Sequence, residues 1–78
     1  MADVAQTVAH RIAVYLGPHT AKNAVKTFAE RALGRSPETL TTADVEPLLA
    51  ALRPMLRTLV GAAQTDVLLE QIKRELLT

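Results

Sequence analysis

Residues 40–60 read LTTADVEPLLAALRPMLRTLV and contain a long, regular apolar pattern. The large apolar side chains recur with the i, i+1, i+4, i+7, i+8 spacing of one helical face. They are Leu48, Leu49, Leu52, Met55, Leu56, Leu59 and Val60. The opposite side carries Glu46, Arg53 and Arg57. The stretch is therefore predicted to be an amphipathic helix with one buried side and one solvated side.

A capping signal marks the beginning of this helix. Thr41 and Asp44 are spaced as in a capping box, with Asp in place of the usual Glu. Leu40 and Val45 occupy the positions of a hydrophobic staple, in which two apolar side chains fix the angle at which the chain enters the helix. We therefore expect the helix to start at Thr42.

Two prolines interrupt the same helix. Pro47 and Pro54 are seven residues apart, on the side away from the leucines. Each proline removes one backbone donor and crowds the preceding turn. The apolar pattern nevertheless continues through Pro54 without a slip. We expect one helix that bends at Pro54, with a break near Glu46 and Pro47 as the alternative.

Three more amphipathic segments flank this helix, and glycines separate them. The first begins at Asp3, a plausible N-cap, and ends at Gly17. The second runs from about residues 18–20 to Gly34, and the last covers residues 62–77 after Gly61. Their predicted buried residues are Val4, Ala5, Val8, Ile12, Tyr15 and Leu16, then Ala21, Ala24, Val25, Phe28, Ala29, Ala32 and Leu33, and finally Thr65, Leu68, Leu69, Ile72 and Leu76.

Length and composition agree with a small helical protein. The chain has 78 residues, which is enough for one domain at most. Nearly half of the residues are hydrophobic, Ala and Leu are frequent, and only Tyr15 and Phe28 are aromatic. We predict an all-α fold, a compact bundle of four short helices around a proline-bent third helix. It is expected to form a single helical domain over residues 1–78.

Charge and cysteine content restrict the class of protein. The formal net charge of +1 does not indicate a nucleic-acid or membrane protein. No apolar run approaches the ~20 residues that span a bilayer, and the N-terminal residues MADVAQTVAH lack a signal-peptide pattern. The chain has no cysteine, which fits a reducing compartment. We expect a cytoplasmic protein without membrane contact.

No set of residues predicts catalysis. His10 and His19 have no acidic residue at metal-ligand spacing, and the only serine, Ser36, precedes a proline. The stretch from Gly17 to Lys22 lacks the preceding strand and the glycines of a phosphate-binding loop, so we interpret it as a tight turn with a helix cap. We expect no catalytic, cofactor-binding or metal-binding residues and therefore no enzyme.

Partner binding is the function that the sequence favours. Val14, Val67 and Leu77 lie off the predicted buried stripes, and small chains often complete their cores with another copy or another protein. Together with Leu69 they are the predicted partner interface, and all but Val14 lie on the last helix. We expect a non-enzymatic interaction or regulatory module that forms a homo-oligomer or docks onto another protein.

A helical DNA-binding domain is the alternative. The polar face of the second helix carries Lys22, Asn23, Lys26 and Arg31, which are possible contacts to an anion or to nucleic acid. Glu30 interrupts this basic face, and the chain has no basic arm. A nucleic-acid partner is therefore possible but less favoured than a protein.

Part of the chain resembles a known kind of module. Tyr15-Leu16-Gly17-Pro18, followed by Ala21-Lys22 and Val25-Lys26, is similar to short helical modules appended to bacterial serine/threonine kinases and other signalling proteins. The resemblance covers about residues 8–33, with one extra residue between Pro18 and the Ala-Lys pair. It implies a regulatory or docking module without activity of its own, acting in a signalling protein or as an adaptor.

Overall fold

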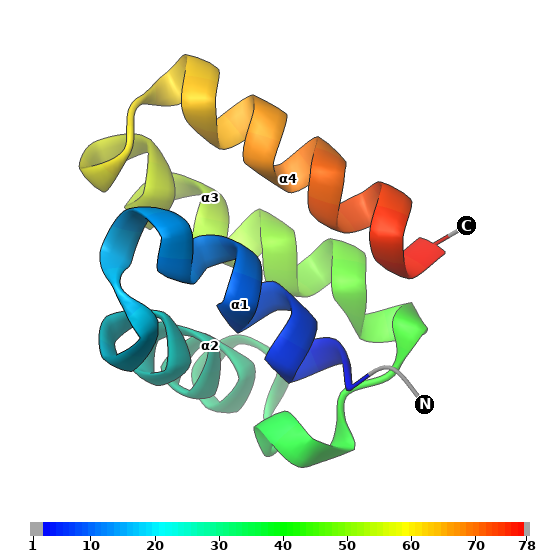
Figure 1. The fold of residues 1–78 in the computed structure, drawn as a ribbon. Coiled ribbons are helices and arrows are strands. Elements are labelled where there is room, and N and C mark those ends of the chain that lie inside the picture. Colours follow the sequence, from blue (N-terminus) through cyan, green and yellow to red (C-terminus); the bar gives the residue numbers. More distant parts are fainter. Residues whose placement is uncertain (1–2, 78) are drawn as a thin grey trace.

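The computed structural model describes residues 3–77. All regular secondary structure in this part of the chain is helical (Figure 1). The α-helices are α1 (Val4–Leu16), α2 (Pro18–Leu33), α3 (Val45–Leu59) and α4 (Ala62–Leu77). Two short 3₁₀ turns, η1 (Pro37–Thr39) and η2 (Thr42–Asp44), lie between α2 and α3. The predicted all-α bundle is confirmed.

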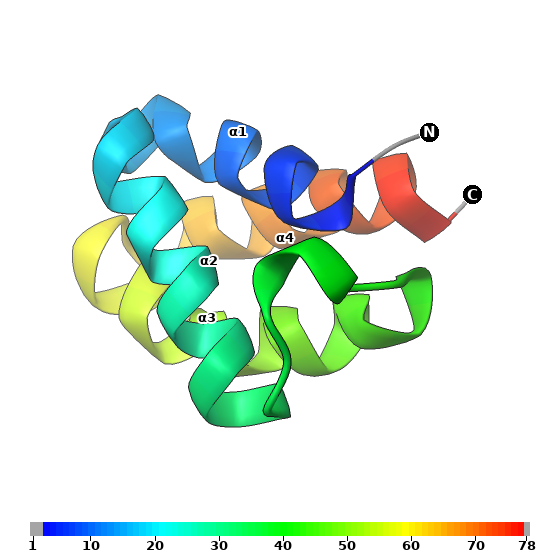
Figure 2. The same cartoon turned by 90° about the horizontal axis from the view of Figure 1, so that it is seen from below.

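The four helices pack as a closed ring. Helix α1 packs against α2 and α4, and α3 packs against the same two helices from the other side. Figures 1 and 2 show α1 and α4 running side by side in opposite directions, with α3 below them when viewed from the second direction. Within residues 3–77, α4 packs mainly against α1 and α3, and Figure 1 shows its opposite side facing away from the bundle.

One hydrophobic core fills the ring. Helix α3 supplies five buried side chains, and α4 supplies leucines and an isoleucine from the opposite side. The buried residues of α3 are Val45, Leu48, Leu49, Leu52 and Leu56. On α2 the core positions are smaller, with Ala21, Ala24 and Ala29 among them, so α1 can approach α2 closely. Leu48, Leu49, Leu52 and Leu56 of the predicted apolar stripe are thus inside the protein.

The beginning of α3 differs slightly from the predicted start at Thr42. The chain first makes the 3₁₀ turn η2, in which the Asp44 N–H donates to the Thr41 carbonyl at 2.9 Å, and α3 begins at Val45. The predicted capping box is present, and the Asp44 carboxylate accepts from the Thr41 N–H at 2.9 Å. This box closes a tight first turn, which explains the shift of the α-helical start by a few residues.

The two prolines have different positions in α3. Pro47 lies in the first turn, where backbone N–H groups have no acceptor within the helix, so it removes no hydrogen bond. The alternative of a break near Glu46 and Pro47 is wrong, because α3 is continuous from Val45 to Leu59. Pro54 lies in the interior of the helix with its ring exposed to solvent, on the side predicted from the pattern. The bend at Pro54 stays a prediction.

Glycines and caps end the other helices as predicted. Gly17 has a φ of +86° and joins α1 directly to Pro18, the first residue of α2. A side chain at this φ would be strained, so glycine is required at this turn. At the other end of α1, the Gln6 N–H donates to the Asp3 carboxylate at 3.1 Å, which confirms Asp3 as the N-cap.

Ion pairs at the surface connect α4 to its neighbours. Arg11 of α1 bonds Glu75 at 2.7 Å, and Arg53 of α3 bonds Asp66 at 2.8 Å. All of these side chains are substantially exposed, so each pair contributes at most about 1 kcal/mol. The buried side chains of α4 therefore contribute more to its position on the bundle than these ion pairs do.

Candidate functional site

Three of the four residues in the predicted interface lie on the surface. The Val14 side chain is 78% exposed, Val67 is 53% exposed and Leu77 is 45% exposed. Neighbouring residues cover these branched aliphatic side chains much less than they cover the side chains of the core. Large apolar groups left in water are available for contact with another molecule.

The fourth residue of the predicted interface, Leu69, was also predicted to be buried, and the structure confirms the burial and not an exposed position. Its side chain is 2% exposed and belongs to the core. Helical periodicity explains the placement, because Leu69 shares an inward face with Ile72 and Leu76, three and seven residues later. Leu69 therefore contributes to the stability of the bundle and is not a surface contact of the folded chain.

Tyr15 and Leu59 are exposed apolar side chains that the sequence pattern placed inside. Tyr15 is 43% exposed and Leu59 is 58% exposed. Both belong to the last turn of a helix, where the helix extends past the core. Their closeness in sequence to Gly17 and Gly61, which end these helices, was the signal that could have predicted their exposure. The Tyr15 hydroxyl donates to Oε1 of Gln64 at 3.4 Å, which links the end of α1 to the beginning of α4.

The outer face of α4 combines two of the exposed aliphatic residues with a pair of opposite charges. We define this face by the residues at alternating four- and three-residue spacing on the side away from the core. They are Ala63, Val67, Glu70, Arg74 and Leu77, and all five are exposed. The 4-3-4-3 spacing is the one with which helices pack against each other in coiled coils. Val67 and Leu77 were predicted as interface residues, whereas the spacing that joins them to Glu70 and Arg74 was not part of that prediction.

Val14 lies on a different part of the surface from Leu77. It belongs to the last turns of α1, whereas Leu77 ends α4. A shallow hollow along this line is lined by Arg11, Gln71, Arg74 and Glu75. The predicted interface residues therefore do not form one continuous apolar patch, and the two on α4 are the ones that share a helix face.

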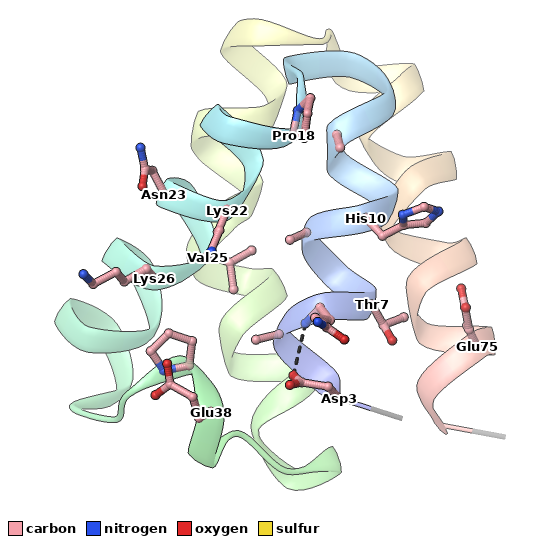
Figure 3. A pocket seen from close by; sticks show the side chains of 15 residues that line it. Asp3, Thr7, His10, Pro18, Lys22, Asn23, Val25, Lys26, Glu38 and Glu75 are labelled. Carbon is pink, nitrogen blue, oxygen red and sulfur yellow. Dashed lines mark hydrogen bonds between the residues drawn. The ribbon is translucent and has the colours of Figure 1, made fainter. Parts of the chain in front are cut away.

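A hollow of about 860 Å³ lies between α1 and α2 (Figure 3). Small apolar side chains line its interior, namely Ala5, Ala9, Ala13 and Val25. Lys22, Asn23 and Lys26, three of the possible anion contacts, line its α2 wall, whereas Arg31 lies outside it. Figure 3 shows Asp3 and Glu38 at the end opposite Pro18, so the hollow carries both signs of charge and is not a dedicated anion site.

The basic residues of α2 are solvent-exposed. Lys22, Lys26 and Arg31 form no ion pair within residues 3–77, and Figure 3 shows Asn23 and Lys26 pointing outward from α2. Glu30 is exposed on the same helix, as the sequence indicated. This surface is accessible to a polyanion, but it is short and interrupted by a carboxylate.

Within the described residues, no group of three or more His, Asp or Glu side chains is arranged to hold a metal ion. His10 lies beside the hollow between α1 and α2, and His19 is exposed in the first turn of α2. No helix in residues 3–77 has both the length and the apolar character needed to cross a membrane.

Comparisons of the chain with protein-family models, with curated proteins and with solved structures gave no match. The resemblance of residues 8–33 to modules appended to bacterial kinases therefore stays a prediction.

Proposed function

We propose that this chain is a non-enzymatic interaction and regulatory module that associates with itself or docks onto another protein, as a signalling or adaptor component. The observation that carries the proposal is the exposure of Val67 and Leu77 on a helix whose core side is already complete. A 78-residue chain of this composition gains stability by covering such residues. The absence of cysteine supports a cytoplasmic setting for this module.

The test is site-specific photo-crosslinking of the full chain in cells that express it. A photoreactive amino acid replaces Val67 in one variant and Leu77 in another. Arg57 and Glu30, which are exposed on α3 and α2, provide matched control positions. We expect a discrete adduct from Val67 and Leu77, either with a second copy or with one other protein, and none from the controls. No adduct from Val67 and Leu77, or equal adducts at all positions, contradicts the proposal.

DNA binding through α2 is the second candidate. Its support is the exposure of Lys22, Lys26 and Arg31, which are unpaired within the described residues. The net charge of +1 and the carboxylate of Glu30 weaken it. A titration of duplex DNA at two salt concentrations separates the candidates, because phosphate contacts make the affinity fall steeply with salt. No binding at low salt excludes this function.

A further inference from the structure

We propose that the hollow between α1 and α2 binds an amphipathic helix of a partner protein, which carries carboxylates on the side facing Lys22 and Lys26 and a basic residue at the end facing Glu38. This inference rests on the proposed function, because it gives the chemistry of a partner protein, and it places that partner on a surface separate from α4. The shape of the hollow, its small interior side chains and the charges around it support the inference.

The hollow is a groove with both ends closed. Gly17 joins α1 directly to α2 at one end, where Pro18 lines the hollow. At the other end η1 packs against both helices, and Pro37 and Glu38 line the hollow there. Figure 3 shows these two ends as the top and the bottom of the space between α1 and α2.

The interior of the groove has room for side chains of an occupant. Ala5, Ala9 and Ala13 line it at four-residue spacing and are only partly buried. They follow α1 over eight residues, a length of about 12 Å. Because each alanine contributes only a methyl group, larger aliphatic side chains of an occupant can enter the groove beside them. Leucines on one face of a helix, three and four residues apart, have the spacing to do so.

Charged residues that do not pair with each other surround this apolar interior. Lys22 and Lys26 lie one helical turn apart on α2 and form no ion pair within the described part of the chain. Glu38 also lacks an ion pair there, and Figure 3 shows it with Asp3 at the end opposite Pro18. An apolar centre with a polar rim is the usual composition of a protein interface. The charges of the rim therefore define the charges expected on the partner.

The elements around the groove favour a helix as its occupant. An extended peptide binds by adding a strand to the edge of a sheet, but this groove is lined by helices and a 3₁₀ turn. A proline-rich peptide binds grooves lined by aromatic residues, and neither Tyr15 nor Phe28 lines this one. A helix satisfies its own backbone hydrogen bonds, and its side chains repeat at the one-turn spacing that separates Lys22 from Lys26.

Shape and charge argue against two other occupants. A second copy that used the same surface would place one hollow against another, and both would stay unfilled. A polyanion carries charges of one sign, which Asp3 and Glu38 would repel at their end of the groove. A partner helix that carries both signs avoids each difficulty. Because the groove is only about 12 Å long, the contact lies below the roughly 1,200 Å² of a stable interface, and we expect a dissociation constant of roughly 100 µM.

Selection from a peptide library tests the charges of the occupant. The library is displayed in many copies on phage, which compensates for weak binding. Its helical peptides have leucines on one face and Glu, Lys or Gln at every position of both flanks and both ends. The immobilised full chain should enrich pairs of Glu four residues apart on one flank and Lys at one end. The K22E/K26E chain should enrich Lys on that flank instead.

An Arg31→Glu chain is the matched control for the selection. It makes the same change of charge at an exposed position of α2 outside the hollow, so it should enrich the same peptides as the wild type.

Fluorescence anisotropy of a selected peptide measures the contact in solution. The peptide is held helical by a side-chain staple, because short isolated helices are marginal. K22E/K26E should weaken its binding about tenfold, and a peptide with Lys in place of the paired Glu should recover it. Ala9→Phe fills the groove and should weaken binding at least about tenfold. Ala50→Phe, at an exposed position of α3, should not change it. Circular dichroism melting confirms that each variant is folded.

Four results would overturn the inference. They are a selection without charge preference, a selected peptide that binds the wild type and Ala9→Phe equally, self-association of the chain that Ala9→Phe abolishes, and duplex DNA that binds Lys22 and Lys26 more tightly than any selected peptide. None of the four removes the proposed function if photo-crosslinking at Val67 yields an adduct. Failure of the proposed function is observed separately, as the absence of adducts from Val67 and Leu77.

Discussion

At the scale of single residues, Thr65 is the anomaly of the core. Its side chain is fully buried, and its hydroxyl has no hydrogen-bond partner within the described structure. The Thr65 N–H already bonds the Gly61 carbonyl at 2.9 Å, but the hydroxyl makes no equivalent bond. A buried polar group without a partner costs about 1–3 kcal/mol. The sequence pattern placed Thr65 on the inner face correctly, yet no pattern predicts whether a buried hydroxyl finds an acceptor.

We expect Thr65→Val to stabilise the protein by about 1 kcal/mol, because valine keeps the shape of the side chain and removes the unsatisfied hydroxyl. Urea unfolding followed by helical circular dichroism measures the free energy of unfolding. Thr58→Val is the control, since its exposed hydroxyl donates to the Pro54 carbonyl at 3.1 Å, and a change within about 0.5 kcal/mol is expected there. Destabilisation by Thr65→Val would show that the hydroxyl has a partner in solution.

At the scale of elements, α3 contains two prolines whose positions in the helix differ. Pro54 deprives the Ala50 carbonyl of its intrahelical donor, whereas Pro47 lies in the first turn, where no such bond exists. We expect Pro54→Ala to raise the free energy of unfolding by about 1–2 kcal/mol, a part of the ~3 kcal/mol penalty of an interior proline. Pro47→Ala should leave the free energy of unfolding unchanged or lower it by up to about 1 kcal/mol, because the unfolded chain gains conformational freedom.

Thermal and urea unfolding of the two proline variants, measured under identical conditions, decides between these effects. Equal responses at the two positions would mean that Pro54 is as well accommodated as a first-turn proline. A loss of stability on Pro54→Ala would show that the leucine packing depends on the local geometry that the proline imposes.

The helices themselves could be predicted from the sequence, and their ends could be predicted less well. Gly17, Gly34 and Gly61 ended α1, α2 and α3 where the pattern indicated, because each has a positive φ that favours glycine. The start of α3 was misplaced because a capping box specifies the first turn but not whether that turn is 3₁₀ or α. Leu59 was misplaced because periodicity gives the direction of a side chain and not the distance to which the core extends.

At the scale of the whole molecule, the candidate site could be predicted only in part. Val67 and Leu77 were identified because they depart from the inward stripe of their helix. Leu69 was placed both in the buried stripe and in the interface, and only its burial is confirmed. Glu70 and Arg74 were not connected to the site. Whether a helix face is covered depends on which other helices pack beside it, and α4 has α1 and α3 as neighbours for reasons of tertiary packing. A single sequence does not contain that information in its periodicity.

The size of the molecule makes its core unusually sensitive to substitution. A chain of 78 residues has a free energy of unfolding of roughly 4–12 kcal/mol. Leu52→Ala removes a fully buried side chain where α3 faces the core and should cost about 2–5 kcal/mol, leaving a marginal fold. Leu59→Ala changes the same residue type on the same helix, but the side chain is mostly exposed, so a cost below about 1 kcal/mol is expected. Urea unfolding at low micromolar concentration, where association does not contribute, measures both changes. Equal costs at the two positions would mean that the leucine stripe of α3 is not the centre of the core.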